Sequence, residues 1–487
     1  MITNFFLKNK QFILMMTLLS CFTFNTKVLK ILKDTLVVAN PNLGAQLIPF
    51  LKTWALIPFT ILIIYIFNKL SNRYSPLRVF QILTSAFLSF FFIYYFFLWP
   101  YTPSVLPSGA IDVVYNLLPD GLHSLGLMIE YWPISLFYVM ADSWSILFIS
   151  LIFWNIISQI VPPERAKETY PWFSLDISAI VIGFIALFFV LFEKIFLQGL
   201  DSAWSFKFSS YMALLISVCL LQLYVFSQLV KREKLPPLPS KKGEGLNVKD
   251  KKKLIRSPFF IGIAITVFLM EFTDALFDTI WKDVLSRAYP DPSDFSNYLS
   301  WVTAINGVLV TFTVFFISRR LLKKYSWTRV AILTPICLAL TSTVFFACLF
   351  FTSFSTTLAE LFSVRPEAVI VFAGAVQACV MQLAKTTFFD NTRELAFLSC
   401  SVEERRIGKS FSDAFATRMG KSTASITQQS LLLLFVVLPA TYSYMSMLIV
   451  LSIPIWIYST CLVGKHLKLR NKEEHILKEE KELATHS

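Results

Sequence analysis

The chain contains 487 residues, of which 55% are hydrophobic and only 15% are charged, and its mean hydropathy is +0.62. A soluble chain typically has about 45–50% apolar and about 25% charged residues, so this composition excludes an ordinary soluble enzyme and a disordered chain. The net charge of +13 would suggest a nucleic-acid partner in a soluble protein, whereas in a membrane protein Lys and Arg mark the cytoplasmic loops.

Twelve apolar segments are long enough to be membrane-spanning helices, each of which needs about 20 mainly apolar residues. The first segment follows Lys8 and Lys10, but no cleavage site of small residues comes after it, so we expect a span and not a signal peptide. The twelve predicted spans cover about residues 11–32, 47–67, 78–100, 132–153, 174–196, 206–230, 258–281, 297–318, 327–352, 366–388, 412–438 and 443–463.

The basic residues are distributed unevenly between the two sides of the membrane. Alternate connections, starting with the N-terminus, carry 32 of the 44 Lys and Arg residues, whereas the opposite connections carry only Lys194, Lys282, Arg287 and Arg365. This asymmetry predicts a membrane protein with an even number of spans and both termini in the cytoplasm. Because the basic segments flank membrane spans, we expect no nucleic-acid partner, and we expect a monomer.

One basic connection, at residues 231–257, is also rich in Pro and Gly and divides the chain into two halves of six spans. We therefore predict an N-terminal six-helix bundle (1–230), a basic cytoplasmic linker (231–257), a C-terminal six-helix bundle (258–465) and a charged cytoplasmic tail (466–487). The predicted fold class is an all-α, major-facilitator-like membrane protein with twelve helices. An internal repeat supports it, because the sequence KDTL at 33–36 returns as KDVL at 282–285, in the equivalent helix.

Residues typical of metal centres and enzyme active sites are scattered. The seven cysteines form no CxxC pair, and the four histidines lie outside the apolar segments. We therefore expect no disulfide, metal site or histidine proton relay. With no nucleophile constellation either, we expect no enzyme activity and no cofactor.

Eight basic residues remain inside or at the end of the predicted spans, where a charge near the bilayer centre costs at least ~2.5–3.5 kcal/mol. Lys27, Lys30 and Lys33 are spaced i, i+3, i+6 and lie within about 120° of one helix face. This stripe needs water, carboxylates or an anion beside it, although Lys33 could instead extend to the headgroups. The other five are Lys52, Lys207, Lys385, Arg418 and Lys421.

Carboxylates lie in two of the predicted spans. Asp142 is in the middle of the fourth span, and Glu271, Asp274 and Asp278 lie along the seventh, which Lys282 follows. Such groups can pair with lysines merely to hold helices together. If they line a central cavity, they can act as a gate or as a proton site.

The eleventh predicted span contains Gly-Lys-Ser twice, at 408–410 and 420–422. Neither copy has the glycine that a phosphate-binding loop requires five residues earlier, so we expect no ATPase motif. We instead expect Arg418 and Lys421 to face a polar lumen, while Gln428 and Gln429 could equally bond between helices. The excess of cations favours a multiply charged anion as substrate.

Several strings of residues resemble the bacterial and plastid ADP/ATP translocase family. They are KDTLVVANPNLGAQLIPFLKTW (33–54), NKLSNR (68–73), LFYVMADSW (136–144), TIWK (279–282), FDNTRELAF (389–397) and the RxGKS…QQ stretch (418–429). They occur in order from the first to the eleventh span. The resemblance implies a major-facilitator fold of twelve helices and exchange of ATP for ADP. Some members of the family instead import nucleoside triphosphates with protons or exchange NAD.

The resemblance also implies roles for individual residues. Lys33 matches a lysine in the first helix of the family, Asp142 and Asp278 stand where the family has Glu, and Lys385 lies at a position that is commonly basic. Lys421, with Lys409 as the alternative, matches the lysine of the GK-rich helix. Aspartate shortens the carboxylate arm, and two further changes make the first helix more positive, namely Lys27 for a neutral residue and Ile31 for an acidic one. The identity of the nucleotide therefore stays open.

The resulting hypothesis is a carrier whose two halves rock about a central cationic site. The expected substrate-binding residues are Lys27, Lys30, Lys33, Lys385, Arg418, Lys421, Asp142 and Asp278. The expected gate or coupling residues are Asp142, Asp274, Asp278 and Lys282. The alternatives are a proton-coupled importer of nucleoside triphosphates, an NAD/ADP exchanger, and an unrelated major-facilitator carrier of another organic anion.

Overall fold

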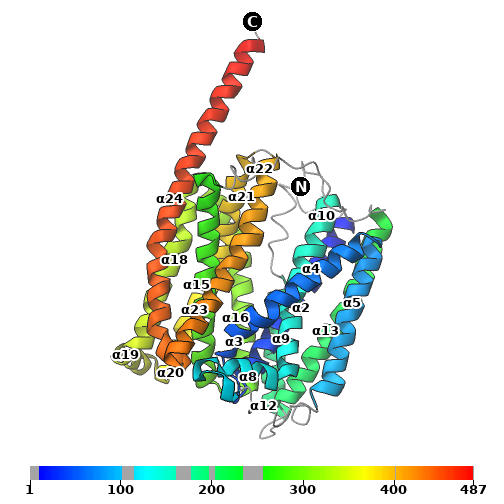
Figure 1. Cartoon of the computed structure of the whole chain (residues 1–487), viewed down its shortest axis with the longest axis vertical. Helices are drawn as coiled ribbons and strands as arrows, with labels where there is room; N and C mark the ends of the chain where they lie inside the picture. The colour runs from blue at the N-terminus through cyan, green and yellow to red at the C-terminus, as the bar shows by residue number, and fades with distance from the viewer. Residues whose placement is uncertain are drawn as a thin grey trace. The chain divides into compact units, whose positions relative to one another are not determined.

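The structure is a computed structural model, and it describes residues 10–100, 115–160, 177–196, 203–233, 256–400 and 402–485. Regular secondary structure in these ranges is entirely helical, with no strand, which confirms the prediction of an all-α protein (Figure 1). The predicted linker at 231–257 lies largely outside the described residues. The predicted division into two six-helix bundles therefore stays a prediction.

Nine helices in the described ranges are long and apolar enough to cross a membrane, and each coincides with a predicted span. The other three predicted spans coincide with helices that are not among these nine. These are α12 (Ile177–Phe196), α16 (Pro292–Thr313) with its continuation η6 (Val314–Ser318), and η8 (Ser410–Ala416) with α23 (Thr417–Phe435). The number of twelve spans thus stays a prediction.

The chain divides by its α-carbon contacts into two compact units. Unit 1 contains Met1–Lys242, Leu285–Thr311 and Leu432–Val437. Helix α2 (Lys10–Val38) packs in it against α12, α9 (Trp132–Trp144), η4 (Ser145–Phe153) and α13 (Ala203–Glu233). The unit also includes α3 (Leu47–Phe50), η1 (Leu51–Leu56), α4 (Ile57–Ser71), α5 (Pro76–Ile93), η2 (Tyr94–Leu98), η3 (Asp120–Leu122), α8 (His123–Glu130), α10 (Trp154–Ile160) and most of α16.

Unit 2 contains Gly243–Val284, Phe312–Leu431 and Leu438–Ser487. Most of helix α15 (Pro258–Ala288) belongs to it, and 78% of the residues in its most apolar stretch are buried. Its other elements are α17 (Arg319–Lys324), α18 (Trp327–Phe350), α19 (Thr352–Phe362), α20 (Pro366–Ala384), η7 (Lys385–Phe389), α21 (Asp390–Leu398), α22 (Val402–Lys409), η8, α23 and α24 (Leu438–Thr485).

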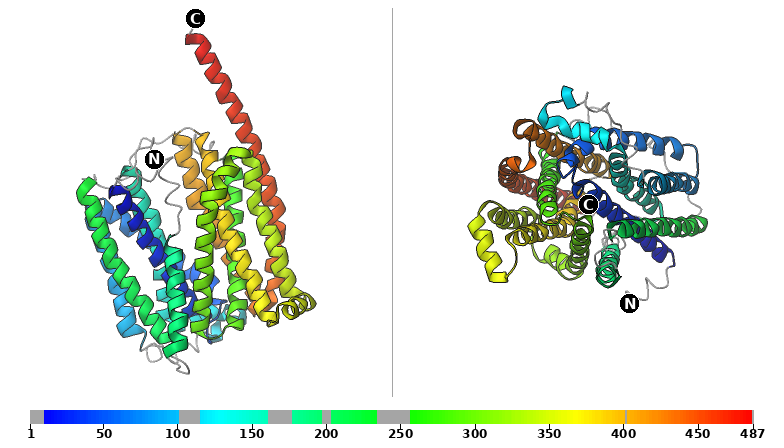
Figure 2. Two further views of the ribbon diagram at one scale, coloured as in Figure 1. Left: turned by 180° about the vertical axis from the view of Figure 1, so that it is seen from behind. Right: turned by 90° about the horizontal axis from the view of Figure 1, so that it is seen from below.

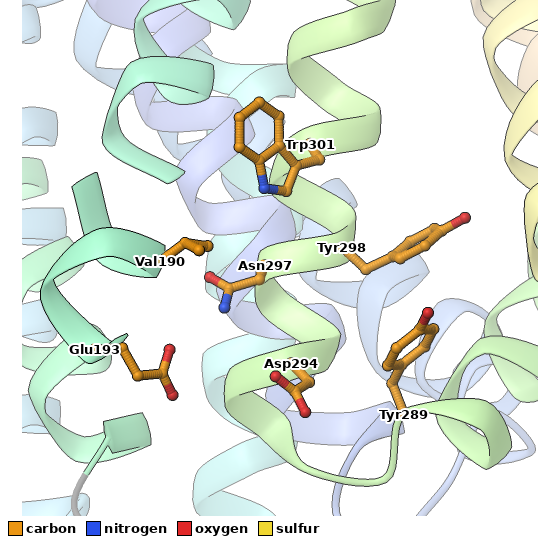
Figure 3. A pocket seen from close by; sticks show the side chains of 7 residues that line it. All are labelled: Val190, Glu193, Tyr289, Asp294, Asn297, Tyr298 and Trp301. Atoms are coloured by element: carbon orange, nitrogen blue, oxygen red, sulfur yellow. The ribbon is translucent and has the colours of Figure 1, made fainter. Parts of the chain in front are cut away.

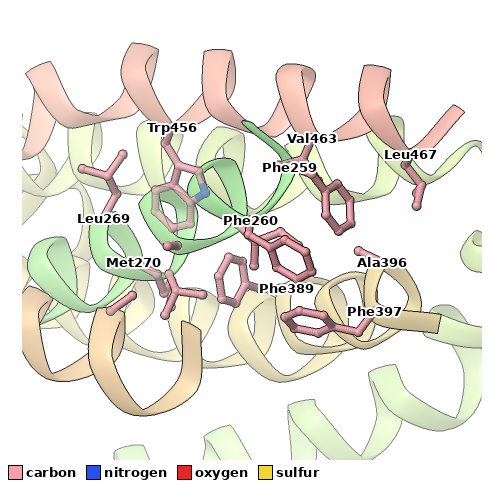
Figure 4. Packing of buried hydrophobic residues seen from close by; sticks show 14 of the residues in the cluster. Phe259, Phe260, Leu269, Met270, Phe389, Ala396, Phe397, Trp456, Val463 and Leu467 are labelled. Atoms are coloured by element: carbon pink, nitrogen blue, oxygen red, sulfur yellow. The ribbon is translucent and has the colours of Figure 1, made fainter. Parts of the chain in front are cut away.

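A cluster of buried apolar side chains joins α15 to its neighbours in unit 2 (Figure 4). Phe259, Phe260 and Met270 of α15 pack with Phe397 of α21 and Trp456 of α24. Between helices in a membrane, such contacts stabilise mainly through close packing, because lipid is as apolar as the side chains. The cluster therefore holds α15 in place by shape.

Glycines let three helices approach α15 closely. A Cβ atom added at Gly262 would lie 2.6 Å from Val463 of α24, and one added at Gly420 of α23 would lie 2.6 Å from the carbonyl oxygen of Phe268. At Gly374 of α20 an added Cβ would overlap the Trp281 ring. Small residues at such crossings bring helix backbones together, so α15 is packed on several sides by close helix contacts.

The charged tail predicted at 466–487 continues the last helix. In Figures 1 and 2, α24 runs without a break from the apolar segment through most of this tail. The described part of the tail is thus helical up to Thr485.

The glycine at 374 provides a test of the packing around α15. We expect Gly374→Val to destabilise the protein by about 1–3 kcal/mol, because the larger side chain must displace Trp281. The midpoint of thermal unfolding of the purified protein in detergent measures the effect. Phe372→Leu is the control on the same helix, since Phe372 is 65% exposed. Equal midpoints for both variants would contradict the close α15–α20 contact.

Candidate substrate-binding site

Lys33 forms a buried ion pair in unit 1. Its ammonium group donates a hydrogen bond to the Asp142 carboxylate of α9, and the side chains are 8% and 29% exposed. The same nitrogen lies 4.2 Å from the centre of the buried Tyr138 ring, a cation–π geometry. The Lys33 side chain therefore lies among the helices of unit 1 and does not extend to the surface.

The lysine stripe on α2 changes environment along the helix. Lys27 is half-buried and Lys30 is exposed, whereas Lys33 is buried. The predicted spacing is present, because the helix is continuous through all three residues. The structure thus pairs Lys33 directly with Asp142 and leaves Lys30 accessible.

A second group of charges in unit 2 is centred on Glu271 of α15. Lys385, the first residue of η7, donates a hydrogen bond of 2.7 Å to Oε1 of Glu271. The ammonium nitrogen of Lys421 in α23 lies 3.4 Å from Oε2. The Glu271 side chain is only 7% exposed. One buried carboxylate therefore contacts two of the lysines predicted to bind phosphate.

The predicted set of site residues did not include Glu271, although its sequence position carries a signal. Residues 271, 274, 278 and 282 follow one another at i, i+3, i+7 and i+11, which places them within about 80° on one face of α15. This face carries three carboxylates and a lysine. The spacing of these residues identifies the charged face of α15. It does not identify the partners of Glu271, because they lie on two other segments, η7 and α23.

Asp278 pairs within its own helix. Its carboxylate lies 2.7 Å from the Lys282 nitrogen, four residues further on, and the Lys282 side chain is 3% exposed. Asp274, one turn earlier, is half-buried. Asp283, the residue after Lys282, accepts a hydrogen bond from Tyr442 of α24. The predicted gate residues of α15 thus lie together on one helix.

The two Gly-Lys-Ser copies differ in their surroundings. Lys409, at the end of α22, pairs at 2.5 Å with Glu394 where both side chains are exposed. Lys421 instead lies beside the buried Glu271, and Arg418 of the same helix is exposed. Within the described ranges both lysines lie inside helical segments, with helical residues before and after them. The geometry favours Lys421 over Lys409 as the site lysine.

Gln428 bonds between helices, which was one of the two readings that its sequence left open. Its amide nitrogen donates a hydrogen bond of 3.2 Å to the carbonyl oxygen of Ala275 in α15, and its side chain is buried. Together with the close contact at Gly420, this bond holds α23 against α15 over two helical turns. It thereby fixes the backbone that carries Lys421.

Lys207 is a third buried cation, which the sequence showed inside a span without assigning it a role. It contacts Glu193 of α12 at 2.5 Å and also donates to the Ser293 hydroxyl of α16, and its side chain is 1% exposed. Ser293 in turn donates to Glu193 at 3.1 Å. This closed network joins three helices of unit 1.

A cavity of about 360 Å³ lies beside this network (Figure 3). Burial and the neighbouring carboxylates of Asp291 and Glu193 raise the pKa of Asp294, which precedes the predicted span. The carboxylates make this cavity unsuitable for a polyanion. It is lined by Val190, Glu193, Tyr289, Asp294, Asn297, Tyr298 and Trp301.

The buried charges share one chemical property, which is that lysines are held by carboxylates within a helical membrane protein. Phosphate oxygens can replace a carboxylate at an ammonium group, because both offer charged acceptors. The arrangement can therefore bind and release an anion.

The fold is similar to that of several solved transporter structures. A bacterial homologue of the iron transporter ferroportin, in an inward-facing state, matches with a TM-score of 0.56 and 14% identity over 94% of this chain and 99% of that chain. A major-facilitator-superfamily proton:xylose symporter matches with a TM-score of 0.50 and 13% identity over 93% and 94%. The likeness shows a multi-pass, all-helical fold of the major-facilitator type, as predicted.

The chain belongs to the TLC ATP/ADP transporter family, whose sequence profile matches residues 2–467. ADP,ATP carrier protein 2 of Chlamydia pneumoniae is 28% identical over 470 residues, which is 91% of this chain and 86% of that protein. The chloroplastic ADP,ATP carrier protein 1 of Arabidopsis thaliana is 28% identical over 93% of this chain and 73% of its own length. The family inferred from the sequence motifs is confirmed.

The network around Lys207 yields a prediction about stability. We expect Lys207→Met to lower the free energy of unfolding by up to about 3–5 kcal/mol, because it leaves the Glu193 carboxylate without its buried partner. The double variant Lys207→Met/Glu193→Gln should recover part of the loss. Thermal unfolding in detergent measures both.

The exposed pair Lys409–Glu394 provides the control for this prediction. Lys409→Met should change stability by no more than about 1 kcal/mol, the usual value of a surface ion pair. If the two lysine variants were equally stable, Lys207 would not be a structural cation.

Proposed function

We propose that this chain exchanges nucleotides of the ATP/ADP type across a membrane by alternating access. The observation that carries the proposal is that lysines on α2, η7 and α23 lie beside carboxylates of the protein. A lysine with a replaceable anionic partner can bind a phosphate group and later return to its carboxylate. The names of the relatives support adenine nucleotides as the anion.

In this proposal the phosphates compete for lysines with the protein's own carboxylates. Lys33 exchanges Asp142 for phosphate in unit 1, and Lys385 and Lys421 bind phosphate in unit 2. A ligand shifts a conformational equilibrium only through different contacts in the two states. The loss of these ion pairs therefore provides the free-energy difference that links nucleotide binding to rocking of the predicted six-helix halves.

The remaining charged residues act before or beside this step. Lys27, Lys30 and Arg418 attract the polyanion, since each carries a positive charge on a helix of the site and Lys30 and Arg418 are exposed. Asp274, Asp278 and Lys282 form the gate or coupling group on the charged face of α15. No bond in the nucleotide is broken, so concentration gradients drive transport.

The last part of the proposal concerns the orientation of the chain and the membrane that contains it. We propose that both termini lie in the cytoplasm, on the basis of the basic connections. The Chlamydia relatives support the inner membrane of a bacterium as the compartment, and we propose that the protein is a monomer. Cysteine labelling with an impermeant reagent from either side of intact cells measures this topology.

Transport itself is tested by uptake of labelled ATP into intact bacterial cells that express the chain. We expect uptake that depends on internal ADP and persists with an uncoupler. Uptake that stops with an uncoupler and needs no internal nucleotide would instead indicate proton-coupled import, and transport of NAD would indicate NAD/ADP exchange. If neither NAD nor any nucleotide accumulates, the proposed function is wrong.

The lysine variants test the assignment of residues. Lys33→Ala and Lys421→Ala should each remove most of the exchange, because each loses a phosphate partner, whereas Lys33→Arg should keep part of it. Lys324→Ala, at an exposed residue of α17, is the control. The same uptake assay measures all four, and normal rates in both alanine variants would refute the assigned site.

A further inference from the structure

Glu271 holds its two lysines unequally. Lys385 donates a hydrogen bond to Oε1 and is 24% exposed, whereas Lys421 lies 3.4 Å from Oε2 and is 55% exposed. Among the described residues, Oε2 is buried and accepts no hydrogen bond. Oε1 of Glu271 thus accepts a hydrogen bond from Lys385. Oε2 has only the longer contact with Lys421, which is the more exposed of the two lysines.

The backbone around Lys421 is fixed close to Glu271. Gly420 permits the close contact, because a Cβ atom at this position would lie 3.0 Å from the Cβ atom of Glu271. Lys421 therefore stays within reach of the carboxylate through its flexible side chain, without movement of α23. Its ammonium group can move between Glu271 and an anion by rotation of the side chain alone.

The charges near this group are nearly balanced. Two lysines face Glu271, and Asp274 and Asp390 are close enough to Lys385 to interact with it electrostatically. Two unneutralised ammonium groups would bind a polyanion tightly, and tight binding is mostly slow dissociation. A carrier must release its substrate in every cycle, so a competing carboxylate at this position serves turnover.

We propose that Glu271 is the carboxylate that releases the nucleotide: it recaptures Lys421, and with it Lys385, when the phosphates leave. The proposal rests on the proposed function and assigns Glu271 as a positioning residue that acts through the two lysines. Removal of the Glu271 charge should therefore strengthen nucleotide binding and lower the exchange rate. The physical reason is that the nucleotide no longer competes with Glu271 for the lysines, so it dissociates more slowly.

The test is Glu271→Gln in the full-length protein, which keeps the size of the side chain and removes its charge. We expect the dissociation constant for labelled ATP, measured by equilibrium binding to the purified protein, to fall about tenfold. We expect the maximal rate of ATP/ADP exchange in proteoliposomes to fall by a similar factor. Glu271→Asp keeps the charge on a shorter arm and should show both changes in the same direction but smaller.

Two further variants act as controls. Glu394→Gln removes the carboxylate of the exposed pair with Lys409 and should leave affinity and rate unchanged. In Glu271→Gln/Lys421→Gln the gain in affinity should disappear, because the lysine through which Glu271 acts is absent.

Each result decides the question. Unchanged or weaker ATP binding by Glu271→Gln, with a lower exchange rate, would mean that Glu271 only supports the structure and would overturn the inference alone. If Glu271→Gln does not fold, Glu271→Asp decides, and wild-type affinity together with wild-type rate in that variant would overturn the inference. Absence of ATP binding by the unchanged protein would overturn the proposed function as well.

Discussion

The structure depends on one constraint, which is that a charge inside a membrane protein needs a partner. Breaking a buried ion pair by removing one member costs about 3–5 kcal/mol, so each buried lysine determines where a carboxylate must lie. Lys33 requires Asp142, Lys207 requires Glu193, and Lys385 shares Glu271 with Lys421. The helices that carry these residues are therefore held in register by charge as well as by packing, and only an anion can replace the carboxylates.

The two units place the positive and the negative member of the ion pair on opposite partners. In unit 1 the central helix α2 supplies the lysine and α9 the carboxylate, whereas in unit 2 α15 supplies the carboxylate and η7 one of the lysines. In both units a π-helix begins at or near the residue that pairs with the central helix. The π-helix η4 begins three residues after Asp142, and η7 begins at Lys385. Such π-helical turns are frequent at functional sites, and here they adjoin residues that exchange partners in the proposed mechanism.

The sequence predicted the charged residues better than their partners. Lys33, Asp142 and Lys421 followed from the cost of intramembrane charge and from the family motifs. Glu271 was visible on the charged face of α15 but was not assigned, because helical spacing shows which residues share a face and not which helix packs against it. Glu193 was missed for the same reason, since its partners Lys207 and Ser293 lie on two other helices. The pairing of Asp278 with Lys282 was accessible, because both lie on one helix at i, i+4.

The sequence by itself determined the class of protein, the positions of most spanning helices and the family, since hydropathy, helical period and ordered motifs are properties of the chain alone. The tertiary structure decided which carboxylate neutralises which lysine and which of the two Gly-Lys-Ser lysines lies beside a buried carboxylate. The physical reason is that an ion pair between helices depends on distances of a few ångströms. Those distances depend on packing at residues such as Gly420, whose missing side chain lets α23 approach Glu271.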